Sequence, residues 1–396
     1  MCSSDLAHQR NAELSVEHVA TQIAMVAGEV SGDLLAGLLL DGVNKRFPHV
    51  STVGIGGPQM AARGFTAWWP SDKLAVRGYV EVLKHYREIV GIRRQLKRRL
   101  IENPPALFLG VDAPDFNLQL ERDLKLAGIK TVHFVCPSVW AWRAERLATI
   151  RQSVDHVLCI FPFEKDLLAQ HGIAATYVGH PLAPVIPMKP DRAAAREVFG
   201  FAQEDRVVAI LPGSRVSEVK YLASVFFQAA ALIREALPGV KFIVPTPANL
   251  LDWVKAAHNG SGLKGQMAVV VGQSHQALAA CDATLIASGT ATLEAALFKR
   301  PMVIAYKMNP LSWQIMRRKK IQPWVGLPNI LLGEFVVPEL LQDQATPEAL
   351  AGQMIAWLEQ PELVRRLVAR FDVLHRDLTR DTAQISTDAI QKILES

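Results

Sequence analysis

Cysteine is scarce in this chain of 396 residues, which contains four. They are Cys2, Cys136, Cys159 and Cys281, and their spacing includes neither a Cys-x-x-Cys pair nor a zinc-ligand pattern. This scarcity argues against a disulfide framework and a structural metal site. We therefore expect reduced thiols, buried or incidental, as in a cytoplasmic protein.

Long apolar runs are lacking as well. Half of the residues are apolar, yet we find no run approaching the roughly 18 residues that cross a bilayer. The first 20 residues are mostly polar and lack the apolar core of a signal peptide, so we expect a loose tail there. The length predicts two domains with room for two hydrophobic cores.

The dinucleotide fingerprint GxGxxG is absent from the first strand-to-helix turn. Residues 26–33 read Val-Ala-Gly-Glu-Val-Ser-Gly-Asp, which disfavours a nicotinamide cofactor. Gly32 permits a tight turn, and Ser31 or Asp33 can cap the helix that follows. Glu29 and Asp33 could instead present carboxylates to an acceptor hydroxyl, and for Asp33 simple capping is an equally good explanation.

Positive charge is modest in sum, at +5, but it is unevenly distributed. Basic residues gather in segments 87–99 and 317–320, and no nucleic-acid-binding motif accompanies them. Such clusters beside apolar residues suit an anionic membrane surface or a phosphorylated lipid. A solvated helix face explains them equally well.

Short apolar strands alternate with helical patterns, which is typical of βαβ units and a parallel sheet. The pattern predicts an α/β protein with two Rossmann-like halves facing a cleft, joined by a proline-rich linker at 180–190. Helices are expected at 33–47, 80–102, 116–127 and throughout the chain after residue 346. Strands are expected at 22–27, 51–55, 106–111, 131–135, 156–160, 175–178, 206–211, 240–244, 268–271, 283–287 and 302–306.

A glycine turn follows the first strand of the second half. Residues 207–215 read Val-Val-Ala-Ile-Leu-Pro-Gly-Ser-Arg and precede a long helical pattern. Ligands of open parallel sheets gather at such strand ends. Gly213 and Ser214 could approach a phosphate, and the forked guanidinium of Arg215 could clamp a diphosphate. The alternative is a surface arginine beside a helix cap.

A matching loop follows the strand at 283–287. Ser288, Gly289 and Thr290 lead directly into a helix, whose N-terminus favours anions. Glu294 lies one turn inside, where a carboxylate could accept hydrogen bonds from sugar hydroxyls. Ser288 and Thr290 could merely cap the helix, but two anion-suited loops in one half favour a nucleotide diphosphate.

The first half contains one carboxylate in a position suited to catalysis. Asp112 follows the strand at 106–111 in the segment Gly-Val-Asp-Ala-Pro-Asp-Phe-Asn, and a carboxylate facing the cleft could act as a general base. A structural turn with Asn117 is the alternative. His133 and His180 also lie at strand ends, but a lone histidine there is more often structural. Trp140 and Trp142 could line a sugar-binding wall, although core packing of at least one is favoured.

Seven motifs, occurring in order between residues 21 and 390, resemble those of the lipid-A-disaccharide synthase family. They are residues 27–33, 110–117, 137–142, 161–164, 211–215, 288–294 and 327–329.

The resemblance implies a GT-B glycosyltransferase that joins UDP-2,3-diacylglucosamine to 2,3-diacylglucosamine 1-phosphate. It also implies no metal and no cofactor, in line with the absence of a DxD-type carboxylate pair near the donor motifs. Asp112 then corresponds to the base that deprotonates the acceptor 6-hydroxyl. The resemblance also assigns residues to the two sides of the site. On the donor side they are Gly213, Ser214, Arg215, Ser288, Gly289, Thr290, Glu294 and Asn329. On the acceptor side they are Glu29, Ser31, Gly32 and Asp33.

Residues 74–100 resemble the family's membrane-touching segment, which implies peripheral association with the cytoplasmic face of the inner membrane. Arg77 departs from the apolar character of the first part of this segment. The residues expected at the membrane are Val76, Tyr79, Val82, Leu83, Arg93, Arg94, Lys97 and Arg98.

The predicted domain plan has a tail at 1–20, an acceptor-binding domain at 21–188 and a UDP-sugar-binding domain at 189–360. Helices at 361–396 are expected to pack back across the first domain. That domain belongs either to the same chain or to a partner, and the second alternative is a homodimer. One rival is an enzyme like UDP-N-acetylglucosamine 2-epimerase, which shares the donor features but needs neither the Asp112 motif nor segment 74–99. The other is a non-catalytic lipid-binding scaffold.

Overall fold

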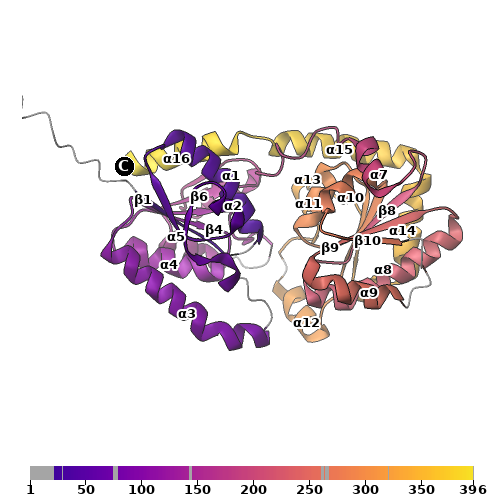
Figure 1. Cartoon of the computed structure of the whole chain (residues 1–396), viewed down its shortest axis with the longest axis horizontal. Helices are drawn as coiled ribbons and strands as arrows, with labels where there is room; N and C mark the ends of the chain where they lie inside the picture. Colours follow the sequence, from indigo (N-terminus) through magenta and orange to yellow (C-terminus); the bar gives the residue numbers. More distant parts are fainter. Residues whose placement is uncertain are drawn as a thin grey trace, which may run out of the picture.

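The structure is a computed structural model that describes residues 22–28, 30–74, 79–141, 145–259, 263, 267–319 and 321–395. Two parallel β-sheets form separate lobes that lie side by side, each covered by helices (Figure 1). The chain is therefore an α/β protein with two Rossmann-like halves, as the alternation of strands and helices predicts.

The first lobe contains a seven-stranded sheet in the order β3-β2-β1-β4-β5-β6-β7. The central strands β1 and β4 are apolar and almost wholly buried, because helices cover both faces of a doubly wound sheet. The strands are β1 (Gln22–Ala27), β2 (Ser51–Gly56), β3 (Thr66–Pro70), β4 (Leu107–Val111), β5 (Thr131–Phe134), β6 (His156–Cys159) and β7 (Ala175–Tyr177). The helices are α1 (Val30–Arg46), α2 (Pro58–Ala61), α3 (Tyr79–Glu102), α4 (Pro114–Leu126), α5 (Arg146–Ser153) and α6 (Pro162–Gln170).

The second lobe contains a six-stranded sheet in the order β10-β9-β8-β11-β12-β13. Its strands are β8 (Val207–Leu211), β9 (Lys241–Thr246), β10 (Met267–Val271), β11 (Ala283–Ala287), β12 (Met302–Tyr306) and β13 (Glu339–Leu341). Its helices are α7 (Arg192–Phe199), α8 (Val216–Ala236), α9 (Leu251–Asn259), α10 (Ser274–Ala280), α11 (Thr290–Leu297), α12 (Pro310–Lys319), α13 (Leu327–Leu332) and α14 (Pro347–Glu359).

The observed strands begin and end within two residues of the predicted ones, except that β3 and β13 were not predicted. Both are edge strands, and most of their residues are half-buried or exposed. They therefore lack the apolar run by which the central strands are recognised. The helix expected at 33–47 begins three residues earlier, at Val30.

The C-terminal helices return to the first lobe of their own chain, as the fold prediction states. Figure 1 shows α15 (Pro361–Leu378) and α16 (Thr382–Glu395) running along one side of both lobes. α15 contacts α11, α13 and α14 of the second lobe, and α16 packs against α1 of the first. The approach at Gly42 is close, since an added Cβ would lie 2.8 Å from the Cβ of Ala383. Arg46 Nε donates to Gln391 Oε1 at 3.0 Å in the same interface.

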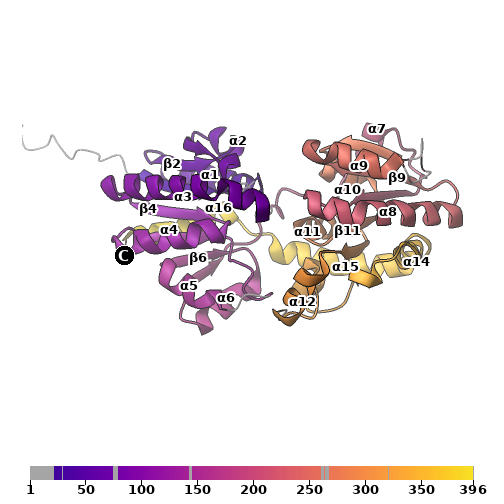
Figure 2. The ribbon, with the colours of Figure 1, turned by 90° about the horizontal axis from the view of Figure 1, so that it is seen from below.

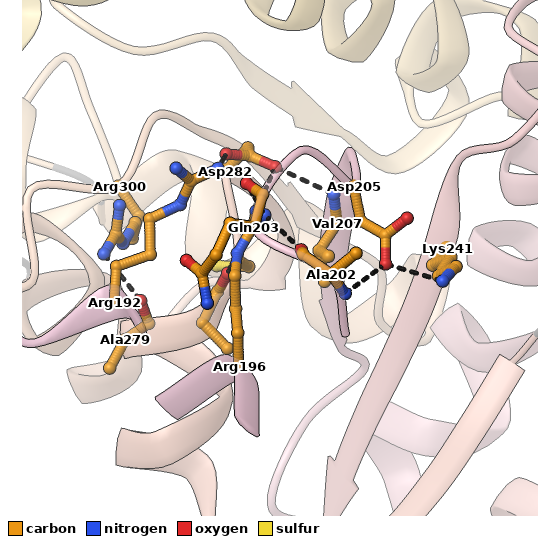
Figure 3. A network of polar contacts seen from close by, with 12 residues as sticks. Arg192, Arg196, Ala202, Gln203, Asp205, Val207, Lys241, Ala279, Asp282 and Arg300 are labelled. Carbon is orange, nitrogen blue, oxygen red and sulfur yellow. Dashed lines mark hydrogen bonds and ion pairs between the residues drawn. The ribbon is translucent and has the colours of Figure 1, made fainter. Parts of the chain in front are cut away.

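A polar network holds the amino ends of the second sheet together (Figure 3). Arg196 of α7 is fully buried and donates from Nη2 to Asp282 Oδ2 at 2.9 Å. The same carboxylate oxygen accepts the N–H of Val207 at 2.8 Å, and Lys241 pairs with Asp205 at 2.5 Å. Arg196 reaches this network from α7, and the other residues lie at or just before the starts of β8, β9 and β11, at the edge opposite the predicted site. We therefore assign the network to folding of this lobe.

One helix in the described part of the chain, α8, is long and apolar enough to cross a membrane by length and composition. The helix contains Glu218, Lys220 and Arg234, so it is not an uninterrupted apolar run of that length. Half of its most apolar window is buried, and Phe226 and Phe227 are fully buried in the core of the second lobe. Burial of this kind is typical of a core helix.

The expectation for the thiols is confirmed where the structure describes them. Cys136, Cys159 and Cys281 are buried and form no disulfide. Cys2 and the expected tail at 1–20 lie outside the described residues.

Candidate active site

The predicted site residues lie where strands end, at the carboxyl edges of both sheets. Asp112 follows β4, Gly213 follows β8 and Ser288 follows β11. β8 and β11 are neighbours at the centre of the second sheet, so their loops lie at one edge. Open parallel sheets bind their ligands at this edge. The topology therefore brings the loops after β8 and β11 together, as the sequence predicts.

The backbone at Asp112 makes a sharp, strained turn. Asp112 and Ala113 have φ of 51° and 45°, in the left-handed region that non-glycine residues rarely adopt. Asn117, fully buried in α4, donates from Nδ2 to the backbone oxygen of Asp112 at 2.8 Å. The Asp112 N–H donates to the oxygen of Phe134 on β5 at 2.9 Å. The predicted turn with Asn117 thus exists, but it uses the backbone of Asp112.

The carboxylate of Asp112 is half-buried and has no hydrogen-bond partner among the described residues. Its charge acts on His133, a fully buried residue of the neighbouring strand β5. His133 Nδ1 lies 2.7 Å from Glu121 Oε1, and Glu121 is fully buried as well. The sequence does not indicate this pair, because its members are twelve residues apart, one on helix α4 and the other on strand β5.

The loop after β8 is shaped by a buried carboxylate, Glu218. Gly213 has a φ of 131°, and an added Cβ would lie 2.4 Å from the Cβ of Glu218, so only glycine fits. Glu218 Oε2 accepts the N–H of Ser214 at 2.9 Å, and Oε1 lies 3.4 Å from Nη1 of Arg215. The Arg215 side chain is half exposed. Glu218 therefore fixes the loop and one side of the guanidinium while the rest remains accessible.

The helix after β11 begins at Thr290 with Gly289 as its N-cap, and no side chain of the described residues accepts a hydrogen bond from its first N–H groups. The alternative that Ser288 and Thr290 merely cap this helix is therefore wrong. Ser288 Oγ instead donates to the backbone oxygen of Val325 at 3.1 Å. Uncapped N–H groups at a helix N-terminus favour an anion.

Glu294, inside α11, already has a protein partner. Its Oε2 lies 3.1 Å from Nε2 of His275 in α10, and the side chain of Glu294 is mostly buried. The ring of His275 lies 5.2 Å from that of Phe298. His275 thus orients the predicted ribose-binding carboxylate, a role that the sequence does not indicate.

Asn329 is fully buried, and its amide is used within the protein. Oδ1 accepts the N–H groups of Val336 and Val337 at 2.8 and 3.0 Å, and Nδ2 donates to Glu339 Oε1 at 2.8 Å. Glu339 also accepts the N–H of Val325 at 2.9 Å, next to the contact of Ser288. A direct contact of Asn329 with the donor does not fit this arrangement. Asn329 instead holds the segment on which Ser288 rests.

The residues expected on the acceptor side differ in accessibility. Asp33 is 3% exposed and accepts the N–H groups of Gly57, Gln59 and Met60, so it caps α2. The expectation that Asp33 caps its own helix is wrong, because α1 begins at Val30.

The other three expected acceptor-side residues lie just before Asp33. Ser31 is exposed. Gly32 is buried, and an added Cβ would lie 3.7 Å from its nearest neighbours, so a small side chain has room there. Glu29 lies outside the described residues.

Trp140 packs in the core, as the alternative to a sugar-binding wall predicts. Its ring meets those of Phe161 and Phe163 edge to face at 6.1 and 5.3 Å. Nε1 donates to Glu164 Oε1 at 2.9 Å, and burial raises the pKa of Glu164 to about 8. Trp142 lies outside the described residues.

Glu164 is expected to make stability depend on pH. The unfolded chain releases this proton near the ordinary pKa of 4.5, while the folded protein keeps it up to about pH 8. The folded state therefore binds the extra proton, and the free energy of unfolding falls by about 1.4 kcal/mol per pH unit across that window. Glu164→Gln removes this fall. Denaturant unfolding at several pH values checks it, and parallel curves for variant and wild type would contradict it.

The basic residues of α3 divide into two groups. Lys97 pairs with Asp123 of α4 at 2.8 Å, and Arg93 lies over the ring of Phe116 at 5.9 Å, so both contact the lobe itself. Arg94 and Arg98 are exposed. Val76 lies outside the described residues, and the structure describes no side chains for Tyr79, Val82 and Leu83.

Within the described ranges, no group of three His, Cys, Asp or Glu side chains could hold a metal ion.

Solved structures with this fold include an epimerase bound to UDP-GlcNAc and a glycosyltransferase. The UDP-GlcNAc 2-epimerase of Neisseria meningitidis, solved with UDP-GlcNAc, has a TM-score of 0.64 at 10% identity and covers 95% of this chain and 99% of its own. MurG of Acinetobacter baumannii has a TM-score of 0.55 at 15% identity, with 94% and 99% covered. At these identities the likeness shows the fold alone, which is that of GT-B glycosyltransferases and related epimerases.

Sequence relatives are much closer. A lipid-A-disaccharide synthase of Albidiferax ferrireducens is 64% identical over 379 residues, covering 94% of this chain and 97% of that protein. One of Verminephrobacter eiseniae is 61% identical over 378 residues, with the same coverage. Residues 23–391 match the family model described as lipid-A-disaccharide synthetase. The epimerase alternative is therefore not favoured, and the chain belongs to the lipid-A-disaccharide synthetase family.

Proposed function

We propose that this chain is an inverting glycosyltransferase of lipid A biosynthesis. Its donor is UDP-2,3-diacylglucosamine and its acceptor is 2,3-diacylglucosamine 1-phosphate. The products are the β-1,6-linked disaccharide 1-phosphate and UDP. The observation that carries the proposal is the family match over residues 23–391. The positions of Asp112 and of the loops after β8 and β11, all at the carboxyl ends of strands, support it.

Asp112 is the general base in this reaction. Its carboxylate takes the proton of the acceptor 6-hydroxyl, and the oxygen attacks the anomeric carbon from the side opposite the diphosphate. The bond between that carbon and the phosphate oxygen breaks, UDP keeps the electron pair, and the configuration inverts. Two observations support this role: the backbone of Asp112 is fixed, and its carboxylate has no hydrogen-bond partner among the described residues.

The loops after β8 and β11 bind the UDP part of the donor. Negative charge grows on the departing diphosphate, and Arg215 together with the N-terminus of α11 stabilises that charge. Glu294, oriented by His275, holds the ribose. Asn329 acts indirectly, through Glu339 and the segment beneath Ser288. Charge stabilisation by these groups requires no metal.

The acylated substrates reach the enzyme from a membrane, and we place the chain at the cytoplasmic face of the inner membrane. Exposed Arg94 and Arg98 on α3 meet anionic head groups. Each basic residue near such a surface contributes about 1 kcal/mol. Reversing both charges is therefore expected to lower binding to vesicles of phosphatidylglycerol by at least roughly tenfold.

A matched control for this vesicle experiment lies on α15. Arg365 and Arg366 are equally exposed adjacent arginines, and reversing them changes the net charge by the same amount. Sedimentation of the protein with vesicles at low salt measures binding. Equal losses in both double variants would assign the binding to net charge and remove α3 from the contact.

The reaction itself is tested in mixed micelles that contain both lipid substrates and a chelator. Mass spectrometry is expected to detect the disaccharide 1-phosphate from the wild type. Product that forms only after a divalent metal is restored would overturn the metal-free part of the proposal. Epimerisation of UDP-N-acetylglucosamine without any disaccharide would overturn the proposed function.

A further inference from the structure

A buried ionisable pair lies beside the turn that carries Asp112. His133 and Glu121 are both fully buried and meet at 2.7 Å. The pair depends on Gly110, the residue of β4 that is in register with His133. A Cβ on Gly110 would lie 2.1 Å from Glu121 Oε1, so the missing side chain makes the space that Glu121 fills.

The charge of Asp112 favours a proton on the imidazole of this pair. Burial raises the pKa of Glu121, against the opposing charge and hydrogen bond of His133. Burial alone would lower the pKa of His133, but the charge and hydrogen bond of Glu121 and the charge of Asp112 outweigh it and raise that pKa. Two carboxylates thus act on this ring, one from α4 and one from the turn after β4. With a proton on the His133 imidazole, the ring is a cation that faces the carboxylates of Glu121 and Asp112.

The pair also leaves polar atoms unsatisfied at this place. Among the described residues, His133 Nε2, Glu121 Oε2 and the neighbouring Asn117 Oδ1 are buried without a hydrogen-bond partner. Each such atom costs about 1–3 kcal/mol. A pair selected only for stability would be replaced by apolar residues at little loss or even a gain. Buried polar groups of this kind, clustered beside a predicted base, indicate a functional role.

We propose that His133 and Glu121 are positioning residues for the base: the imidazolium, anchored by Glu121, places a positive charge beside Asp112 and orients its carboxylate toward the proton of the acceptor hydroxyl. The inference rests on the proposed function, because it takes Asp112 as the base. Neither residue touches substrate in this arrangement. The proton of the pair stays within the pair throughout.

Glu121→Gln tests the proposal, because it removes the anchoring charge and keeps an amide of the same shape. We expect kcat to fall by about tenfold, which corresponds to about 1.4 kcal/mol, while KM for both substrates stays within about twofold. The acid limb of the pH–rate profile is expected to move toward neutral pH. The imidazole nitrogen shifts of His133, measured by NMR, are expected to change from imidazolium to neutral imidazole.

Thr131→Val is the matched control. Thr131 is fully buried and lies at the opposite end of the same strand, β5. Its hydroxyl donates hydrogen bonds to Ser153 and Asp155, and the valine variant loses them. We expect this variant to lose stability without any shift of the pH–rate profile. If Glu121→Gln does not fold, His133→Gln gives the same kinetic test. It removes the imidazole, and the amide of the new side chain can still donate a hydrogen bond to Glu121.

A double-mutant cycle separates this inference from the proposed function. In an Asp112→Asn background the pair has no carboxylate to support, so Glu121→Gln is expected to have no further effect on kcat. An equal fall in kcat with and without Asp112, or an unmoved pH–rate profile, would overturn the positioning role. Normal activity of Asp112→Asn alone would overturn the base assignment, and the NMR result for His133 would still stand.

Discussion

Asp112→Asn is expected to lower kcat by about three orders of magnitude, within the range of general-base catalysis. The amide cannot take the proton of the acceptor hydroxyl, yet it matches the carboxylate in shape. The turn is expected to survive, because Asn117 and Phe134 hold the backbone of residue 112 and not its side chain. KM values are therefore expected to change little, and the thermal midpoint to stay close to that of the wild type.

Asp115→Asn provides the matched control for this result. Asp115 lies three residues further along the same turn, in the first turn of α4, and its carboxylate pairs with Arg146. The control removes an equal charge from the same loop. Near-normal kcat for Asp115→Asn together with the large fall for Asp112→Asn would locate the base. Similar, modest falls in both would mean that the loop needs negative charge and that the base lies elsewhere.

Strand ends could be predicted from the sequence because their signals are local. Apolar, β-branched runs followed by small or polar residues mark β4, β8 and β11, and the carboxyl edge of a parallel sheet then brings their loops to the ligand side. The sites at Asp112 and Arg215 follow from this rule. The role of Glu218 could also have been predicted from the sequence, because an acidic residue in the first helical turn after Arg215 is a local signal.

Long-range partners could not be predicted in this way. His133 meets Glu121, His275 meets Glu294 and Asn329 meets Glu339 only through the packing of separate elements. A sequence shows that such residues exist but not which of them face each other. Asn329 and Asp33 illustrate the consequence. Both occur in motifs of the family, which suggested contact with substrate, and both are buried and used to hold backbone in place.

Arg215→Ala is expected to lower kcat/KM by about two orders of magnitude, the usual effect of removing one group that stabilises developing charge. Glu218 contacts Nη1 of Arg215, and half of the side chain is exposed, so the guanidinium can reach a diphosphate without leaving its partner. Because the exposed pair contributes little to stability, the thermal midpoint is expected to stay near that of the wild type. Steady-state kinetics and calorimetric titration with UDP measure the two effects.

Arg215→Lys distinguishes charge from geometry at this position. Lysine keeps one positive charge but loses the planar fork that matches a diphosphate. Recovery of most of the lost rate would show that charge suffices, whereas recovery limited to roughly tenfold would favour a bidentate contact. Lys220→Ala, one turn further along α8 and stacked over Trp253 at 4.5 Å, controls for the loss of a nearby cation. Unchanged UDP affinity and rate in Arg215→Ala would move the diphosphate contact away from this loop and leave the uncapped N-terminus of α11 as its main site.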